Sequence, residues 1–173
     1  MTLALALLAG CAGSKSTKAT DTAGSRPPPP PAVPGPATPI QAMVASMHES
    51  IVIAGDPGQS LISLHELSNH SHATSAEFDQ MRARLADALG RASAEQRLPM
   101  RFVADAQGPG DFQLSGTVYL VTSSGFDQWE MYLDLRSAGG ASTIWRPEGA
   151  WRMLREPRPG QPDMQFIPTP AKQ

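Results

Sequence analysis

Two stretches of the sequence alternate apolar and polar residues with the period of two that a β-strand requires. They cover residues 112–121 and 129–136, with a turn-like segment at residues 122–125 between them. Successive side chains of a strand point to opposite faces of a sheet, so each stretch predicts one buried and one exposed face. The two stretches therefore predict a β-hairpin with a single buried face. The apolar positions are Phe112, Leu114, Val118 and Leu120 in the first stretch and Trp129, Met131, Leu133 and Leu135 in the second.

Shorter apolar segments surround the hairpin and predict further strands. They lie at residues 48–54, 61–67, 100–104, 143–145 and 151–154. The first contains the β-branched run Ile51-Val52-Ile53, a residue type that favours strands. Gly116 stands inside a hairpin strand, which indicates a bulge or a close approach of a neighbouring backbone.

One segment carries the pattern of an amphipathic helix. Thr74 and Glu77 have the spacing of a capping box, and apolar residues follow at helical intervals from Phe78 to Leu89. Gly90 is either the C-terminal stop of this helix or a weak point within it, and Pro99 ends any helix. The chain is therefore predicted to have an α/β fold, with a small mixed or antiparallel sheet and one or more packed helices, preceded by a disordered tether.

Proline usage divides the chain into segments. Of its 173 residues, 17 are proline, and residues 27–31 are consecutive prolines. Residues 12–39 lack apolar periodicity and predict a disordered tether, extended in its proline-rich half and flexible in its Gly/Ser/Thr half. Residues 40–156 predict the globular domain, and residues 157–173 predict a proline-rich disordered tail.

The charge balance excludes one class of partner. The formal net charge is -2, so the chain has no large basic field, and we do not expect it to bind nucleic acid. No apolar run reaches the roughly 18 residues that a membrane-spanning helix needs.

The single cysteine, Cys11, stands directly after a short apolar segment that ends in small residues. Leu8-Ala9-Gly10-Cys11 resembles the lipobox of bacterial lipoproteins, which implies that residues 1–11 form a signal peptide ending in a lipidated, palmitate-bearing cysteine. Two or more acyl chains make a stable anchor. A buried or chance cysteine at the end of a leader is the alternative. No Lys or Arg precedes Cys11, which leaves the true start codon open.

No catalytic constellation is visible, so we expect neither enzymatic activity, nor a cofactor, nor a small-molecule substrate. His65, His70 and His72 lie close together and could bind a transition metal, but their polar loop favours simple solvation. The sequence does not decide whether these three histidines bind metal. Glu130 and Asp134 fall on the polar positions of a strand and predict a solvated face.

The end of the predicted domain combines arginine with tryptophan, residues that are enriched at binding hot spots. This pattern predicts a partner-binding face at the following residues: Trp145, Arg146, Trp151, Arg152 and Arg155. The alternative is a tryptophan pair in the core, with arginines that keep a sheet edge soluble.

The order of these features resembles a known family. A lipobox, a proline-rich tether and a helix precede Asp111 to Gly116, and a hairpin with Leu133-Asp134-Leu135 and Ile144-Trp145 follows. This arrangement resembles the penicillin-binding-protein activator lipoproteins of the LpoB family. The resemblance implies an outer-membrane lipoprotein on the periplasmic face that binds a bifunctional penicillin-binding protein and activates peptidoglycan synthesis in the cell wall. It leaves open which synthase is bound, through which residues, and in what oligomeric state.

A second interpretation is a structural or assembly lipoprotein of an envelope or secretion complex. Both interpretations suit the same fold, because a fold does not determine function.

Overall fold

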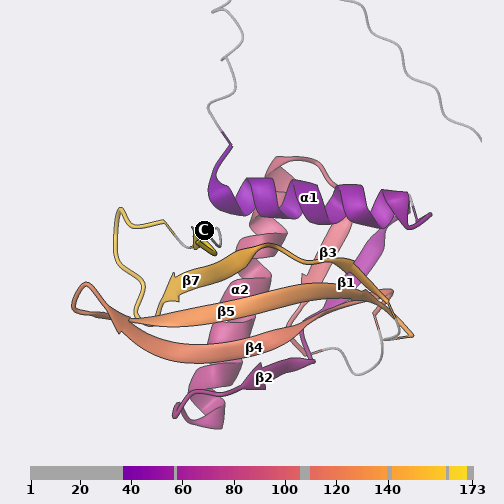
Figure 1. The fold of residues 1–173 in the computed structure, drawn as a ribbon. Helices are drawn as coiled ribbons and strands as arrows, with labels where there is room; N and C mark the ends of the chain where they lie inside the picture. The colour runs from indigo at the N-terminus through magenta and orange to yellow at the C-terminus, as the bar shows by residue number, and fades with distance from the viewer. Residues whose placement is uncertain (1–36, 57, 106–109, 140–141, 163, 171–173) are drawn as a thin grey trace, which may run out of the picture. The chain divides into compact units, whose positions relative to one another are not determined.

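The computed structural model describes residues 37–56, 58–105, 110–139, 142–162 and 164–170. These residues form an α/β fold, which confirms the predicted fold class (Figure 1). The two helices are α1 (Pro39–Ile53) and α2 (Ser75–Glu95). The strands are β1 (Ser60–Ser63), β2 (Leu67–Asn69), β3 (Met100–Val103), β4 (Phe112–Ser123), β5 (Phe126–Ser137), β6 (Thr143–Trp145), β7 (Gly149–Leu154) and β8 (Gln165–Pro168).

All eight strands join one mixed sheet, the first of the two predicted kinds. Its order is β3-β1-β4-β5-β7-β8, with β2 paired to β4 and β6 paired to β5. The pairs β1·β3, β1·β4 and β2·β4 are parallel, whereas the pairs from β4 to β8 are antiparallel. The long hairpin of β4 and β5 therefore joins a parallel half of the sheet to an antiparallel half.

The predicted hairpin is confirmed. Strands β4 and β5 pair without interruption from Phe112↔Ser137 to Ser123↔Phe126. The turn consists of Ser124 and Gly125, with φ angles of 54° and 78°. Two consecutive positive φ angles match the twist of antiparallel strands, which explains the tight connection.

Gly116 allows β4 and β5 to approach closely. Its φ is 150°, and a Cβ at this position would lie 2.0 Å from the carbonyl oxygen of Tyr132. The register continues through Gly116↔Leu133 without a shift, so the glycine marks close packing and not a bulge.

Helix α2 begins as predicted. The Thr74 hydroxyl accepts a hydrogen bond from the Glu77 amide at 3.3 Å, and the Glu77 carboxylate accepts one from the Thr74 amide at 2.9 Å. The helix continues beyond Gly90 to Glu95, so the glycine is a weak point within the helix and not its end. Buried Ser93 holds this last turn, because its hydroxyl donates to the Met100 carbonyl at 3.0 Å.

Helix α1 corrects the strand predicted at residues 48–54. It begins at Pro39, so the predicted tether ends one residue earlier than expected. Thr38 and Gln41 form a capping box, and Pro39 suits the first helical position because its missing amide proton needs no partner there. The buried residues of this helix follow the helical period and outweigh the β-propensity of its last turn. They are Met43, Val44, Met47 and Ile51.

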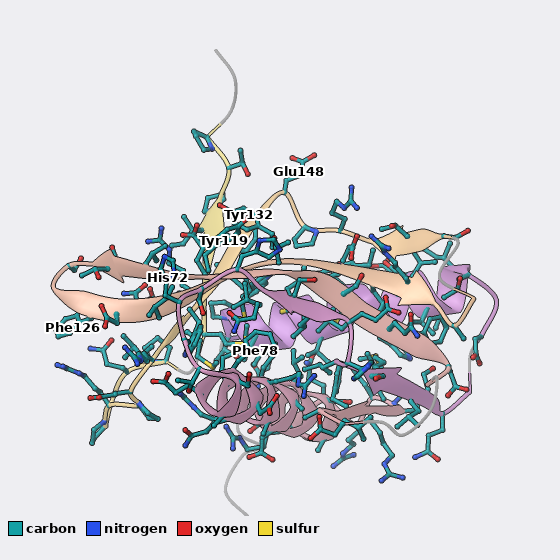
Figure 2. All side chains as sticks on the ribbon, turned by 90° about the horizontal axis from the view of Figure 1, so that it is seen from below. His72, Phe78, Tyr119, Phe126, Tyr132 and Glu148 are labelled. Carbon is teal, nitrogen blue, oxygen red and sulfur yellow. The ribbon has the colours of Figure 1, made fainter. Side chains whose placement is uncertain are left out.

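Both helices pack on the same face of the sheet. Trp145 pairs with Leu135 and donates from Nε1 to the Ser46 hydroxyl of α1 at 3.0 Å, so α1 lies on the side of Leu135. The residues of α2 belong to the same core cluster. Figure 2 shows Tyr119 and Tyr132 on one side of the sheet and Phe78 of α2 on the other. We call the side of these tyrosines the open face, because neither described helix covers it.

Strand β8 corrects the predicted disordered tail. It pairs with β7 through Ala150↔Ile167 and Trp151↔Phe166. The Phe166 ring lies 5.0 Å from the Trp151 ring, and Met164 is almost fully buried. Pro168 fits at this edge strand because the edge needs no amide donor there.

Neither described helix is long and apolar enough to cross a membrane.

Candidate functional site

The open face is defined by the residues of β4, β5 and β7 that point away from the helices. Residues paired across antiparallel strands share a face, so the register assigns them. They are Gln113, Ser115, Thr117, Tyr119 and Val121 of β4, Gln128, Glu130, Tyr132, Asp134 and Arg136 of β5, and Ala150, Arg152 and Leu154 of β7.

Three aromatic side chains gather on this face. Tyr119 and Tyr132 remain 38% and 47% exposed. Their rings meet edge to face, with centroids 6.1 Å apart, and the His70 ring lies 5.6 Å from Tyr119. Because Tyr has few rotatable bonds and a polar tip, such a cluster offers contact area to a partner at low entropic cost.

An ion pair lies beside the tyrosines and runs across the strands. Glu130 stands opposite Tyr119 of β4 and opposite Arg152 of β7. Arg152 binds Glu130 Oε2 through Nε at 2.7 Å and Nη2 at 2.5 Å. The Tyr132 hydroxyl donates to Glu130 Oε1 at 3.0 Å, and this bond raises the pKa of Tyr132 because it favours the protonated phenol.

A second charged cluster centres on Asp134. Its side chain is 8% exposed and accepts hydrogen bonds from Arg146 at 2.7 Å, from Arg136 at 3.1 Å and from the Ser115 hydroxyl. Burial raises the pKa of this carboxyl, but the bonds from Ser115, Arg146 and Arg136 outweigh burial and leave the pKa below its usual value. Asp134 is therefore a buried, ionised anchor for two arginines on the surface.

A wide cavity of about 760 Å³ opens beside these groups. It is lined by Thr117, Tyr132, Asp134, Arg136 and Arg146, and further along by Glu148 and Thr169. A shallower cavity of about 580 Å³ adjoins Tyr119 and Glu130 and shares Thr117 and Tyr132 with the first. The open face is thus hollowed along β4 and β5, where an extended segment of a partner could lie.

The five residues predicted to bind a partner fall in three different places. Trp145 and Trp151 are 8% and 4% exposed and belong to the core, which is the alternative interpretation of the tryptophan pair. Arg146 and Arg152 reach the open face through the ion pairs described above. Arg155 points to the helix side and binds Glu77 of α2 and, at 3.4 Å, Asp127. A partner-binding role for these residues stays a prediction.

The contact between Arg155 and Glu77 joins the start of α2 to the end of β7. The bonds that Glu77 accepts from the Thr74 amide, the Arg155 guanidinium and the Thr74 hydroxyl lower its pKa from 4.5 to about 2. The same contact raises the pKa of Arg155. Both groups therefore stay charged over the whole physiological range.

Cys11 and the three histidines are the remaining residues that the sequence singled out. Cys11 lies outside the described residues. Of the three histidines, His70 reaches the open face through its contact with Tyr119. Within the described ranges, no group of three or more His, Cys, Asp or Glu side chains is placed to hold a metal ion.

Sequence reasoning missed the aromatic pair and misjudged the carboxylates. The alternating pattern put Tyr119, Tyr132, Glu130 and Asp134 on the outer face, but the prediction of a solvated face was wrong for the two carboxylates. Glu130 and Asp134 have side chains only 14% and 8% exposed, because arginines from neighbouring strands and loops cover them. Tyr119 and Tyr132 are aromatic residues at outward-facing positions of the two hairpin strands, and this pattern could have predicted the aromatic pair.

Comparison with known proteins gives one structural likeness. No model of a known protein family matches the chain, and no curated protein matches it in sequence. The chain is similar to a solved structure described as "LpoB C-terminal domain from Salmonella enterica (Sel-Met)". The identity is 14% and the TM-score is 0.37, over 64% of this chain and 93% of that chain. A likeness this distant carries no information on partner or activity.

Proposed function

We propose that this protein is a lipid-anchored regulator on the periplasmic face of the outer membrane. It binds a bifunctional penicillin-binding protein and activates peptidoglycan synthesis. The lipobox-like Cys11, the proline-rich tether and the family resemblance of residues 111–116 support this proposal.

The observation that carries the proposal is the open face of the sheet. Tyr119 and Tyr132 are large, exposed and held against each other, and the ion pairs of Glu130 and Asp134 fix the polar groups around them. Side chains that are already ordered lose little entropy on binding, which favours affinity for a partner protein. The opposite face of the sheet is not available, because the helices bury it.

Activation follows from differential affinity. A synthase that exchanges between a less and a more active conformation shifts toward the second if the regulator binds that conformation more tightly. A coupling of about 1–3 kcal/mol corresponds to a 5- to 150-fold change in equilibrium, which is the usual range. Exposed aromatic and arginine side chains supply interactions of this size.

The tether sets where this regulation can act. An extended proline-rich chain spans about 3.1 Å per residue, so residues 12–38 would reach about 85 Å from the anchor at most. The tether also sets the effective concentration of the domain at the synthase, so that activation would depend on the distance from the outer membrane to the cell wall.

The test is a reconstituted reaction. A purified bifunctional penicillin-binding protein in detergent polymerises and crosslinks lipid-linked precursor, and both rates are measured with and without the full chain. The proposal predicts that both rates increase in a saturable way. Unchanged rates at saturating regulator would overturn it.

A pull-down from solubilised membranes tests the partner itself. The full chain is the bait, and we expect a bifunctional penicillin-binding protein to be retained. Recovery of secretion or envelope-assembly components, with no synthase, would instead support the structural or assembly lipoprotein.

A further inference from the structure

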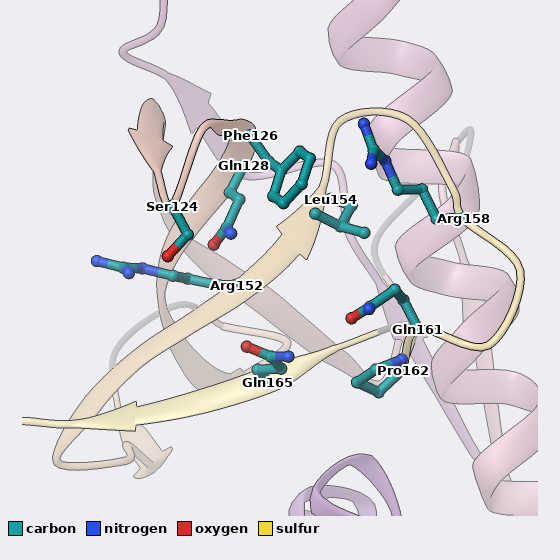
Figure 3. Close-up of a pocket in the computed structure, with 9 residues that line it drawn as sticks. All are labelled: Ser124, Phe126, Gln128, Arg152, Leu154, Arg158, Gln161, Pro162 and Gln165. Atoms are coloured by element: carbon teal, nitrogen blue, oxygen red, sulfur yellow. The ribbon is translucent and has the colours of Figure 1, made fainter.

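A third cavity lies at the tip of the β4–β5 hairpin, away from the ion pairs of Asp134. The hairpin turn forms one wall, and residues 158–162, which follow β7, form the other together with Gln165 of β8 (Figure 3). The cavity has a volume of about 230 Å³. Its lining residues are Ser124, Phe126, Gln128, Arg152, Leu154, Arg158, Gln161, Pro162 and Gln165.

Neutral hydrogen-bonding groups dominate this pocket. Gln128, Gln161 and Gln165 come from three separate segments, and Figure 3 shows their side chains around the same space, with the Ser124 hydroxyl nearby. An amide side chain both donates and accepts, so it matches the backbone of an extended peptide. Phe126 and Leu154 add apolar surface beside these amides.

The charges of the pocket have one sign. Arg152 and Arg158 line it, and no described lining residue is acidic. Arg152 uses Nε and Nη2 to bind Glu130 on the open face. Arg158 has no carboxylate partner within the described ranges, and its guanidinium carbon lies 4.0 Å from the centroid of the Phe126 ring.

The contact with Phe126 positions Arg158 to bind an anion. The Phe126 ring accepts no N–H hydrogen bond from the fork in the plane of the guanidinium, so the N–H groups of Arg158 remain available to donate. A carboxylate accepts two such bonds in parallel, with a fixed geometry. The glutamine amides that line the same cavity would then contact the peptide backbone of the same ligand.

We propose that this pocket binds a short peptide through a carboxylate group, with Arg158 as the carboxylate-binding residue and the three glutamines as contacts to the peptide backbone. The carboxylate can come from the C-terminus of a peptide or from an acidic side chain. The inference goes beyond the proposed function and does not depend on it, because its ligand is a peptide and not the synthase.

The experiment is an NMR titration of the ¹⁵N-labelled full chain carrying Cys11→Ser with three defined peptides. They are N-acetyl-trialanine with a free C-terminus, its C-terminal amide, and N-acetyl-Ala-Glu-Ala amide. At least one carboxylate peptide should shift the backbone signals of Phe126, Gln128 and Gln165 in a saturable way, and the uncharged trialanine amide should bind at least about tenfold more weakly. The better of the two charged peptides identifies the source of the carboxylate.

Two variants test whether Arg158 binds the peptide carboxylate. Arg158 is exposed, so its replacement should not unfold the domain. Arg158→Gln should weaken the better peptide at least about tenfold, and Arg158→Lys should also weaken it because lysine lacks the planar fork. Arg101→Gln removes an exposed arginine from β3, at the other end of the strand order, and should bind like the unsubstituted protein.

Three results would overturn the proposal. The first is the absence of saturable shifts at about 10 mM peptide, ten times a weak Kd of about 1 mM. The second is that the Arg158→Gln variant binds the better peptide as tightly as the unsubstituted protein does. The third is that the unsubstituted protein binds inorganic phosphate as tightly as the better peptide, which would reduce the pocket to an unselective cationic surface. None of these results affects the synthase assay, so the two proposals fail separately.

Discussion

The two faces of the β4–β5 hairpin come from the same twenty-odd residues and have opposite characters. On the helix side, Leu114, Val118 and Met131 are completely buried. On the open face, their neighbours Tyr119 and Tyr132 keep 38% and 47% of their surface exposed. Because the register fixes both faces together, a shift of one residue would exchange them. The hairpin therefore contributes one face to the core and exposes the other, where we propose that a partner binds.

The open face also contains a buried charged side chain that lies outside the hydrophobic core. Asp134 is as inaccessible as several core residues, yet it stands on the open face. Its three hydrogen-bond donors replace the water that it loses, which is the condition for burying a charge. The contribution of the open face to the free energy of unfolding should therefore depend on specific hydrogen-bonded ion pairs. The contribution of the helix face should depend on the volume of its buried apolar side chains.

The largest expected effect separates the two faces directly. Leu114→Ala should lower the free energy of unfolding by about 3 kcal/mol, because it removes a buried side chain and leaves a cavity. Gln113→Ala, one residue away on the open face, should change it by less than about 0.5 kcal/mol. Urea unfolding of both variants measures the difference, and equal losses would contradict the division of the sheet into two faces.

A smaller loss is expected from Asp134→Asn. The amide keeps the shape of the carboxylate but loses the charge that Arg146 and Arg136 bind, which should cost about 2 kcal/mol of unfolding free energy. Glu148→Gln is the matched control, since Glu148 is exposed beside the same cavity. If both variants unfold at the same urea concentration as the unsubstituted protein, the Asp134 cluster does not stabilise the open face.

The next smaller effect concerns Glu77 on the helix side, where the free energy of unfolding should depend on pH. The pKa of Glu77 is lowered from 4.5 to about 2 in the folded protein, so the unfolded chain binds more protons between these values. The contribution of Glu77 is thus present above pH 4.5 and is lost as the pH falls toward 2. Glu77→Gln should flatten the fall in stability across this window, measured by urea unfolding at several pH values. If the unfolding free energy of Glu77→Gln depends on pH as steeply as that of the unsubstituted protein, the bonds from Thr74 and Arg155 do not stabilise the ionised Glu77 carboxylate.

Strong local patterns predicted much of this fold. The hairpin was visible because its alternation extends over many residues, and the start of α2 was visible in Thr74 and Glu77. Helix α1 was missed because the run Ile51-Val52-Ile53 favours a strand. The capping box of Thr38 and Gln41, with Pro39 at the first helical position, was the better signal.

Features that depend on tertiary contacts were harder to predict. Strand β8 has four residues among prolines and exists because β7 offers an edge for it to pair with. Trp145 and Trp151 have the composition of a binding hot spot, but their strands turn them toward the helices. The open face could be assigned from alternation, whereas the partners of Asp134 could not, since Arg146 lies beyond the end of a different strand.

The proposed role of the open face is tested most directly by the affinity of a purified bifunctional penicillin-binding protein for the full chain. The double variant Tyr119→Ala/Tyr132→Ala removes the exposed aromatic pair and should unfold within about 1 kcal/mol of the unsubstituted protein, because both side chains are exposed and a cross-strand pair contributes only about 0.2–1 kcal/mol. We predict that it binds the synthase at least about tenfold more weakly, while Arg101→Gln binds normally. Equal affinity of the double variant and the unsubstituted protein would contradict the assignment of partner binding to the open face.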